Sequence, residues 1–291
     1  MTWLITGGSG QLGLAFQAEL ALQGIDFVSV NSHELDITNQ DLVEELVDSL
    51  MPEVIINSAA WTDVDGAETN ESAAHAVNAL GPRYLAIAAS EATARLVQVS
   101  TDYVFSGEGT APWGEGAQHN PQSVYGSTKS EGEKLVLGSH PSGSYVVRTA
   151  WLYSAQRKNF AKTMTKLALN GAGEVRVVND QVGQPTFTDD LAKQIIDLVV
   201  SDSPVGIYHG TNSGQATWFE FAQEIFKLAG ADVSRVVPVS SSEYPRPAKR
   251  PSYSVLGHDA WANTSVEPMR DWRIALAEAM PAIISAVKAE G

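Results

Sequence analysis

The sequence predicts an α/β fold, in which a doubly wound parallel sheet forms most of the molecule and a smaller region follows it. Short apolar or β-branched runs alternate with stretches of helical periodicity along most of the chain. Such alternation, with runs too apolar to face water, is typical of parallel strands that helices cover on both faces. The expected strands are residues 3–6, 27–30, 54–57, 96–100, 145–148 and 175–178.

The expected helices lie between and after these strands. Apolar residues recur in them at spacings of three and four, as in a helix that packs on a sheet. They span residues 11–22, 42–50, 72–91, 127–137, 160–169 and 191–200. After Gly206 the rhythm loosens into a short strand at 207–209, a helix at 218–228 and a proline-bearing loop at 240–251.

The charge balance argues against two classes of partner. The 291 residues include 34 acidic and 19 basic side chains, a formal net charge of −15, and no cysteine. This charge repels nucleic acid and anionic membranes, and the nearest approach to a basic patch is Arg246, Lys249 and Arg250. No stretch resembles a membrane span or a secretion signal. We therefore expect a cytoplasmic protein that binds neither nucleic acid nor membranes.

Three glycines lie at the first strand–helix junction. Gly7, Gly10 and Gly13 follow the first strand and open the first helix, in the order that a dinucleotide-binding turn requires. Glycine permits the tight turn and the close approach of backbone to a pyrophosphate, and the helix N-terminus offers free N–H groups. The sheet should therefore be Rossmann-like, with 1–148 and about 174–205 forming the dinucleotide-binding domain and 149–291 mainly a substrate-binding region.

The end of the second strand bears on the choice between NADP and NAD. An acidic residue that binds a ribose hydroxyl is expected roughly twenty residues after the glycines, but Asn31, Ser32 and His33 occur there. Nothing at these positions repels a 2′-phosphate, so NADPH is favoured and NADH is the alternative. Asp36 could contact the adenine end of the cofactor, or it could be a turn or helix-capping residue.

Tyr125 and Lys129 form the candidate proton-transfer pair. They lie four residues apart in a predicted helix, so both side chains occupy one face. A free tyrosine, with a pKa of about 10, exchanges protons poorly near neutrality, whereas a neighbouring ammonium favours the phenolate and lowers that pKa. The spacing alone also fits an ordinary exposed pair, so the surrounding motifs must decide.

Polar or small residues end the two strands that precede this helix. Ser100 and Thr101 could each hydrogen-bond a substrate carbonyl, or they could cap a turn. Ala59 and Ala60 leave room for a cofactor to approach the backbone. Because the carboxyl ends of parallel strands share one edge of a sheet, these segments should meet the glycine loop there.

Acidic residues after the third strand could be mistaken for a metal site. Asp63, Asp65 and Glu68 lie close together, but no histidine pair or dense carboxylate loop accompanies them. Acidic side chains are also favoured near a helix N-terminus, where we expect Asp65 and Glu68 to lie. We therefore predict no bound metal.

Taken together, these segments resemble one family, the dTDP-4-dehydrorhamnose reductases of the extended short-chain dehydrogenases. The glycine loop and the tyrosine–lysine pair occur across the superfamily, whereas the set STDYVF at 100–105, RTAWLY at 148–153 and DQVGQPT at 180–186 is much narrower. The resemblance covers most of the chain. Its other parts are residues 7–13, 35–38, 57–68, 125–129, 206–209 and 249–251.

The resemblance implies a reaction and catalytic roles. NADPH, or NADH as the alternative, would reduce the C4 ketone of dTDP-4-dehydro-L-rhamnose to dTDP-L-rhamnose for cell-surface polysaccharide. Tyr125 would protonate the developing alkoxide, and Lys129 would hold the nicotinamide ribose and lower the tyrosine pKa. Thr101, rather than Ser100, would orient the carbonyl.

The resemblance also implies binding residues. Besides Tyr125 and Lys129, the cofactor would contact Gly7, Gly10, Gln11, Leu12, Gly13, Asp36, Ile37, Ala59 and Ala60. The sugar nucleotide would contact Thr62, Val64, Thr101, Asp102, Tyr103 and Trp151. The indole of Trp151 could pack on a thymine or a sugar, or it could belong to a core. Some family members dimerise around Mg²⁺ through glutamates, which we cannot match here, so a homodimer is open and no metal is expected.

Two other interpretations stay open. A related sugar-nucleotide reductase, epimerase or dehydratase would share the glycine loop and the tyrosine–lysine pair, although a dehydratase would want more acidic groups than Asp102 alone. A non-catalytic regulatory subunit is the other, since the family resembles a methionine adenosyltransferase partner that keeps the fold. The presence of Thr101, Tyr125 and Lys129 together favours an enzyme.

Overall fold

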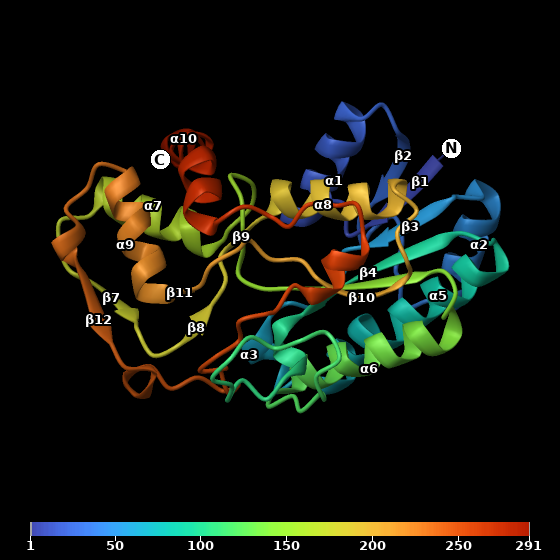
Figure 1. Cartoon of the computed structure of the whole chain (residues 1–291), viewed down its shortest axis with the longest axis horizontal. Coiled ribbons are helices and arrows are strands. Elements are labelled where there is room, and N and C mark those ends of the chain that lie inside the picture. The colour runs from blue at the N-terminus through green and yellow to red at the C-terminus, as the bar shows by residue number, and fades with distance from the viewer. Residues whose placement is uncertain (1, 291) are drawn as a thin grey trace.

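The computed structural model describes residues 2–290, and its larger part is a six-stranded parallel sheet (Figure 1). Along the sheet the strands are β10 (Gly206–His209), β5 (Ser144–Thr149), β4 (Arg95–Thr101), β3 (Val54–Asn57), β1 (Thr2–Thr6) and β2 (Asp26–Val30). The chain runs from β1 to β2 and then crosses to β3 on the other side of β1. This creates a topological switch point between β1 and β3, where sheets of this kind bind ligands.

Helices cover both faces of the sheet, which confirms the predicted doubly wound α/β architecture (Figure 1). They are α1 (Gln11–Leu22) and α8 (Thr188–Val200) on one face, and α2 (Gln40–Leu50), α5 (Gly81–Glu91) and α6 (Val124–Ser139) on the other. Side chains alternate between the faces of a strand. In β1, Trp3 and Ile5 accordingly pack with α1 and α8, whereas Leu4 packs with α2 and α5.

The helix expected at 72–91 is divided in the structure. Its segments are α4 (Glu71–His75), a π-helical turn (Ala76–Leu80) and α5. A separate short helix, α3 (Val64–Ala67), precedes them. The π-helical turn lies against α6, where a Cβ on Gly132 would be 2.1 Å from the carbonyl oxygen of Asn78. The absence of a side chain at Gly132 therefore lets α6, which carries Tyr125 and Lys129, approach this helix closely.

The smaller part of the molecule has a core of its own. Its elements are α7 (Phe160–Asn170), α9 (Trp218–Leu228), α10 (Trp272–Ala289) and the strand pairs β7 (Val175–Val178) with β12 (Val236–Val239), β8 (Val182–Gly183) with β11 (Ala216–Thr217), and β6 (Leu152–Tyr153) with β9 (Thr186–Phe187). Phe221, Phe226 and Trp272 are among the large side chains that fill this core. Within residues 2–290, none of the helices combines the length and the apolar character that a membrane crossing needs.

The strand predicted at 175–178 does not belong to the large sheet. It is β7, which pairs with β12 in the smaller part. The strand expected at 207–209 in the smaller region is β10, which lies at the edge of the large sheet beside β5, so its assignment to the smaller region is wrong. A β-branched run correctly indicates an extended segment, but its apolarity does not specify which of two cores the segment enters. The range 174–205 was predicted to belong to the sheet domain. This holds for α8, which packs against α1 on the large sheet, but not for β7. The boundary near residue 148 stays a prediction.

Candidate active site

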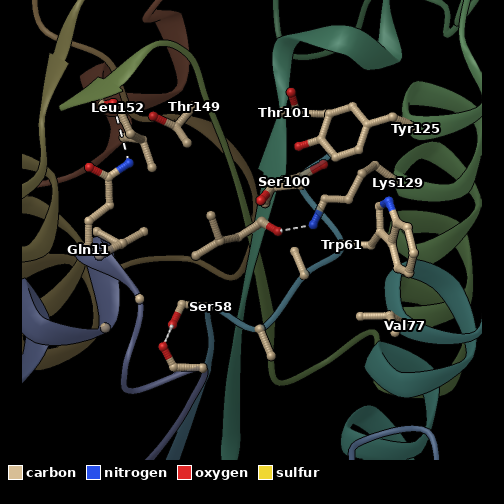
Figure 2. A pocket seen from close by; sticks show the side chains of 18 of the residues that line it. Gln11, Ser58, Trp61, Val77, Ser100, Thr101, Tyr125, Lys129, Thr149 and Leu152 are labelled. Carbon is tan, nitrogen blue, oxygen red and sulfur yellow. Dashed lines mark hydrogen bonds between the residues drawn. The ribbon is translucent and has the colours of Figure 1, made fainter. Parts of the chain in front are cut away.

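The switch point of the sheet opens into a cavity of about 700 Å³, a size typical of cofactor and small-molecule sites (Figure 2). Each binding or catalytic residue predicted from the sequence lies in its wall. These residues are Gly7, Gly10, Gln11, Leu12, Gly13, Asp36, Ile37, Ala59, Ala60, Thr62, Val64, Thr101, Asp102, Tyr103, Tyr125, Lys129 and Trp151. Segments far apart in the sequence therefore meet at one place, and their individual roles stay predictions.

The glycine loop forms one wall of the cavity in a way that fits a dinucleotide. Gly7 has a φ of 71°, and a Cβ there would lie 2.6 Å from the backbone nitrogen of Ala59. A Cβ on Gly13 would lie 2.4 Å from the carbonyl oxygen of Gly7. Helix α1 begins after Gly10 with no side-chain cap and no acidic residue in its first turn. Its first N–H groups are therefore available to a pyrophosphate.

We expect Gly7→Ala to weaken NADPH binding more than Gly24→Ala does. Both glycines have positive φ, so both variants suffer the left-handed strain of roughly 1–2 kcal/mol. At Gly7 the methyl group would also displace the backbone at Ala59, whereas nothing lies within 4 Å of a Cβ at Gly24. Fluorescence titration with NADPH should show a loss of about tenfold or more for Gly7→Ala alone. Equal losses in both variants would contradict the contact argument.

Buried polar groups fix the strand ends beside the glycine loop. Asn57 is completely buried at the end of β3 and accepts hydrogen bonds from the Thr6 hydroxyl (2.6 Å) and the Ala59 N–H (3.1 Å). It also donates to Gln98 Oε1 on β4 (2.7 Å). One side chain thus links β1, β3 and β4, so the backbone that carries Ala59 and Ala60 is held in place at the cavity.

Asp36 lines the cavity and is also a turn residue. Its carboxylate accepts hydrogen bonds from the backbone N–H (2.9 Å) and the hydroxyl (2.7 Å) of Thr38. Asn39, not Asp36, caps α2, through a hydrogen bond from the N–H of Leu42 (3.3 Å). The capping alternative is therefore wrong, while a cofactor contact and a turn role are compatible.

Thr101, Tyr125 and Lys129 meet where β4 ends (Figure 2). Thr101 is the last residue of β4, and the other two lie in the first turns of α6. The helix starts in direct contact with the segment after β4, because a Cβ on Gly126 would lie 2.3 Å from the carbonyl oxygen of Tyr103. This close approach brings the helix face that carries the phenol and the ammonium group to the cavity.

The electrostatics of Tyr125 differ from the expectation. Burial raises the pKa of this phenol to about 12, a hydrogen bond with the Thr101 hydroxyl acts against the rise, and the nearby Asp102 carboxylate adds to it. The predicted lowering of this pKa by Lys129 is therefore wrong. Burial dominates, and Lys129 Nζ donates to the carbonyl oxygen of Val99 (2.6 Å). At this pKa the phenol carries its proton at neutral pH, but it is a weaker acid than a free tyrosine.

Asp102 is a second buried acid in the cavity wall. Burial raises its pKa to about 6, and its Oδ1 accepts a hydrogen bond from the Thr101 hydroxyl (3.0 Å). The Thr101 oxygen in turn accepts a hydrogen bond from the N–H of Tyr103 (3.3 Å). These contacts place the Thr101 hydroxyl beside the Tyr125 phenol, where its one proton can be donated to Asp102 or to another acceptor.

Two stacked tryptophans form the wall on the side of the smaller region. The rings of Trp151 and Trp218 have centroids 3.6 Å apart and planes inclined by 12°. Trp151 has a φ of 47°, which is uncommon for a non-glycine residue. Both rings also pack against the smaller core, so Trp151 serves the core as well as the cavity. Trp218 could not be predicted as a cavity residue, because a contact between such distant residues leaves no local pattern in the sequence.

The acidic cluster after β3 has structural partners. Asp63 caps α3, and Glu68 Oε1 accepts a hydrogen bond from the N–H of Val124 (2.9 Å), which joins this segment to the start of α6. Asp65 pairs with Arg250 Nη2 (2.9 Å). In the part of the chain that the structure describes, no three histidine, aspartate or glutamate side chains are grouped so that they could hold a metal ion.

Comparison with known proteins identifies the family. The family model described as the RmlD substrate binding domain matches residues 1–284. This chain belongs to the RmlD family. The dTDP-4-dehydrorhamnose reductase of Streptomyces griseus is 45% identical over 285 residues, which cover 97% of this chain and 93% of that protein. The family resemblance drawn from the sequence motifs is thus confirmed.

Two further relatives show how wide the similarity is. A probable dTDP-4,6-dihydroxy-2-methyloxan-3-one 4-ketoreductase of Streptomyces antibioticus is also 45% identical, over 287 residues that cover 98% of this chain and 97% of that protein. The crystal structure of the dTDP-4-dehydrorhamnose reductase of Bacillus anthracis in complex with NADP matches with a TM-score of 0.92 at 38% identity, covering 96% of this chain and 98% of that chain.

In this RmlD family member a second cavity of about 700 Å³ shares Tyr103 and Trp218 with the first. The basic residues in its wall are Arg176, Arg246, Lys249 and Arg250. Arg250 Nη1 is buried and has no hydrogen-bond partner among residues 2–290. The basic residues at 246–250 were not among the site residues predicted from the sequence. The sequence feature that could have indicated this site is the occurrence of three basic residues within five consecutive positions, in a chain with a strongly negative net charge.

Proposed function

We propose that this protein reduces the C4 ketone of dTDP-4-dehydro-L-rhamnose to dTDP-L-rhamnose with NADPH. The observation that carries the proposal is the meeting of Thr101, Tyr125 and Lys129 in a cavity that begins at a dinucleotide-binding glycine loop. The names of the S. griseus and B. anthracis relatives support the substrate, and the NADP bound to the latter supports the cofactor.

The residues of the cavity suit the cofactor. Gly7, Gly10 and the N-terminus of α1 would hold its pyrophosphate, and Lys129 its nicotinamide ribose. Bound NADPH supplies the hydride that reduces the ketone. Ser32 lines the cavity at the end of β2, where an acidic residue would repel a 2′-phosphate. We therefore assign NADPH as the preferred donor and NADH as the alternative.

Tyr125 is the proton donor in this proposal. Its phenol stays protonated at neutral pH and would transfer its proton to the substrate oxygen as negative charge develops there. Thr101 lies beside the phenol and would orient the carbonyl, while the Lys129 ammonium would stabilise the tyrosinate that remains. Burial strengthens each of these interactions, because little water competes for the charges.

The second cavity supports a sugar nucleotide rather than a simple ketone. Its four basic side chains pair with Asp65, Glu108 and Glu243 in the structure, and they could exchange these partners for a diphosphate. The buried, unpartnered Nη1 of Arg250 is a ready donor for a phosphate oxygen. Because Tyr103 and Trp218 line both cavities, one ligand could place its sugar beside Tyr125 and its diphosphate beside Arg250.

Loss of NADPH absorbance in the presence of dTDP-4-dehydro-L-rhamnose tests the function. We expect oxidation that depends on the sugar nucleotide, dTDP-L-rhamnose as the product, and competitive inhibition by dTDP alone. NADH should support a lower kcat/KM. The absence of sugar-dependent oxidation, with NADPH binding intact, would overturn the proposal and favour a non-catalytic regulatory subunit.

Reduction of a different 4-keto dTDP-sugar is the second candidate. It is favoured by the S. antibioticus relative, which is as similar to this chain as the S. griseus protein and is named as a 4-ketoreductase of another dTDP-linked sugar. The same assay with both sugar nucleotides separates the two candidates, because the true substrate should have the higher kcat/KM.

A further inference from the structure

We propose that Glu133 is a positioning residue for the active site, which fixes the Ser100 hydroxyl beside Thr101 and supplies the negative charge that keeps Lys129 an ammonium ion. This inference rests on the proposed function, because it concerns the lysine assigned to the nicotinamide ribose. Glu133 itself does not line the cavity. It would act through the two side chains that do.

The sequence places Glu133 on the catalytic face of α6. Tyr125, Lys129 and Glu133 follow one another at intervals of four residues, so their side chains share one side of the helix. Glu133 is 1% exposed, and the Ser100 hydroxyl donates a hydrogen bond to its Oε1. Ser100 and Lys129 lie on the same side of the cavity (Figure 2). The Glu133 carboxylate, which does not line the cavity, is therefore hydrogen-bonded to the Ser100 hydroxyl, which does.

Arg148 on β5 holds the Glu133 carboxylate in place. The guanidinium group donates from Nε to both carboxylate oxygens (3.0 and 3.1 Å) and from Nη2 to Oε2 (2.7 Å). Arg148 is itself 1% exposed, and its remaining donors contact the carbonyl oxygen of Glu115 (2.9 Å) and the rings of His119 and His209. The carboxylate can therefore hardly turn, and the Ser100 hydroxyl is held with it.

Lys129 and Glu133 lie about one helical turn apart, and the charge of Glu133 favours the ammonium form of Lys129. Its side chain is buried, with Nζ hydrogen-bonded to the carbonyl oxygen of Val99. Burial lowers the pKa of Lys129 to about 8, and the Glu133 charge is what opposes this fall. The other titratable groups around this pair are Tyr125, Asp102, Arg148, His119 and His209.

The two histidines add no positive charge beside the Glu133 carboxylate at neutral pH. Burial lowers the pKa of His119 and lowers that of His209 to about 3, so both rings are neutral at pH 7. Asp102 lies near the Tyr125 phenol, whose pKa it raises, and Tyr125 stays protonated at neutral pH. Within the described residues, Glu133 is thus the acidic group whose charge acts on Lys129.

The pH profile of Glu133→Gln tests the proposal. The amide can still accept the Ser100 hydrogen bond, but it has no charge, so the pKa of Lys129 should fall. Because the ammonium is the active form, activity is lost as pH rises through this pKa. The basic limb of the kcat profile should therefore move to lower pH by on the order of one unit, with most activity recovered at pH 6. The NADPH dissociation constant, measured by fluorescence, should show the same displacement.

Glu131→Gln is the matched control. Glu131 lies on the same helix, is half exposed and pairs with His75 (3.2 Å) rather than with an active-site group. Its pH profiles should equal those of the wild type. The NADPH measurement also separates this inference from the proposed function, since it needs no turnover of the sugar nucleotide.

If Glu133→Gln does not fold, a second variant can test the proposal. Arg148 would be left as an uncompensated buried charge, which the double variant Glu133→Gln/Arg148→Met removes. Because the double variant also loses the positive charge of Arg148, its basic limb should move in the same direction as that of the single variant, but by less. Glu133→Asp, which keeps the charge, should restore much of the wild-type profile. The proposal would be overturned if the basic limb of the folded single or double variant stayed at the wild-type pH. It would also be overturned if kcat fell by the same factor at every pH.

Discussion

Tyr125→Phe lowers kcat by a factor on the order of 10²–10⁴, while NADPH still binds. The phenyl ring keeps the edge-to-face contact with Tyr103, whose ring centroid lies 5.5 Å away, so the wall of the cavity is preserved. The variant lacks the phenol proton that the proposed mechanism delivers to the substrate oxygen. Steady-state rates of NADPH oxidation with the sugar nucleotide, together with fluorescence titration of NADPH, measure the two effects separately.

Tyr145→Phe provides the comparison for this variant. Tyr145 is also fully buried, but its hydroxyl donates to the carbonyl oxygen of Ser203 (2.8 Å) and it does not line the cavity. We expect its kcat to be close to that of the wild type, although its stability should fall because a buried hydrogen bond is lost. A wild-type rate in Tyr125→Phe would exclude the phenol as the proton donor.

Arg148→Met lowers the free energy of unfolding by about 3–5 kcal/mol. Arg148 is buried against the Phe105 ring, with its guanidinium carbon 5.1 Å from the ring centroid, and it is the ion-pair partner of Glu133. Methionine fills much of the same volume but leaves the Glu133 carboxylate buried without a counter-charge. Urea unfolding at neutral pH measures the loss.

Arg95→Met is the control for this second prediction. Arg95 pairs with Asp202 at the surface, where solvent screens the charges, so we expect a loss within about 1 kcal/mol. Addition of Glu133→Gln to Arg148→Met should restore part of the lost stability, because no buried charge is then left alone. Equal losses of unfolding free energy for Arg148→Met and Arg95→Met would show that the buried ion pair contributes no more to stability than the surface pair.

The parts of the site that could be predicted from the sequence are encoded over short distances. The glycines at 7, 10 and 13 indicate a tight turn, whose geometry depends on neighbouring residues only. The spacing of Tyr125 and Lys129 predicts one shared helix face. The end of β4 at Thr101 could be located because a polar residue follows an apolar strand. Because parallel strands end at one edge of a sheet, the sequence alone predicts that these separate segments lie together.

Other features depend on which distant surfaces pack together. The strand at 175–178 has the composition of a sheet strand, but its partner in the smaller core is β12. The stacking of Trp218 on Trp151 and the basic wall around Arg250 likewise join residues that are far apart in the chain. Local propensity does not specify such partners, because a hydrophobic or charged side chain can be satisfied by any complementary surface.

Residue type and spacing were enough to predict the α/β fold class and the family, and to point to the glycine loop and the tyrosine–lysine pair as candidates. The electrostatics depend on how the chain packs. Whether Lys129 lowers the pKa of Tyr125 depends on burial and on the hydrogen bond to Val99, and burial raises that pKa instead. The connection of Ser100 to Glu133 and Arg148 also exists only in the folded chain. Solvent exclusion comes from long-range packing, so charge and protonation in this site are properties of the fold.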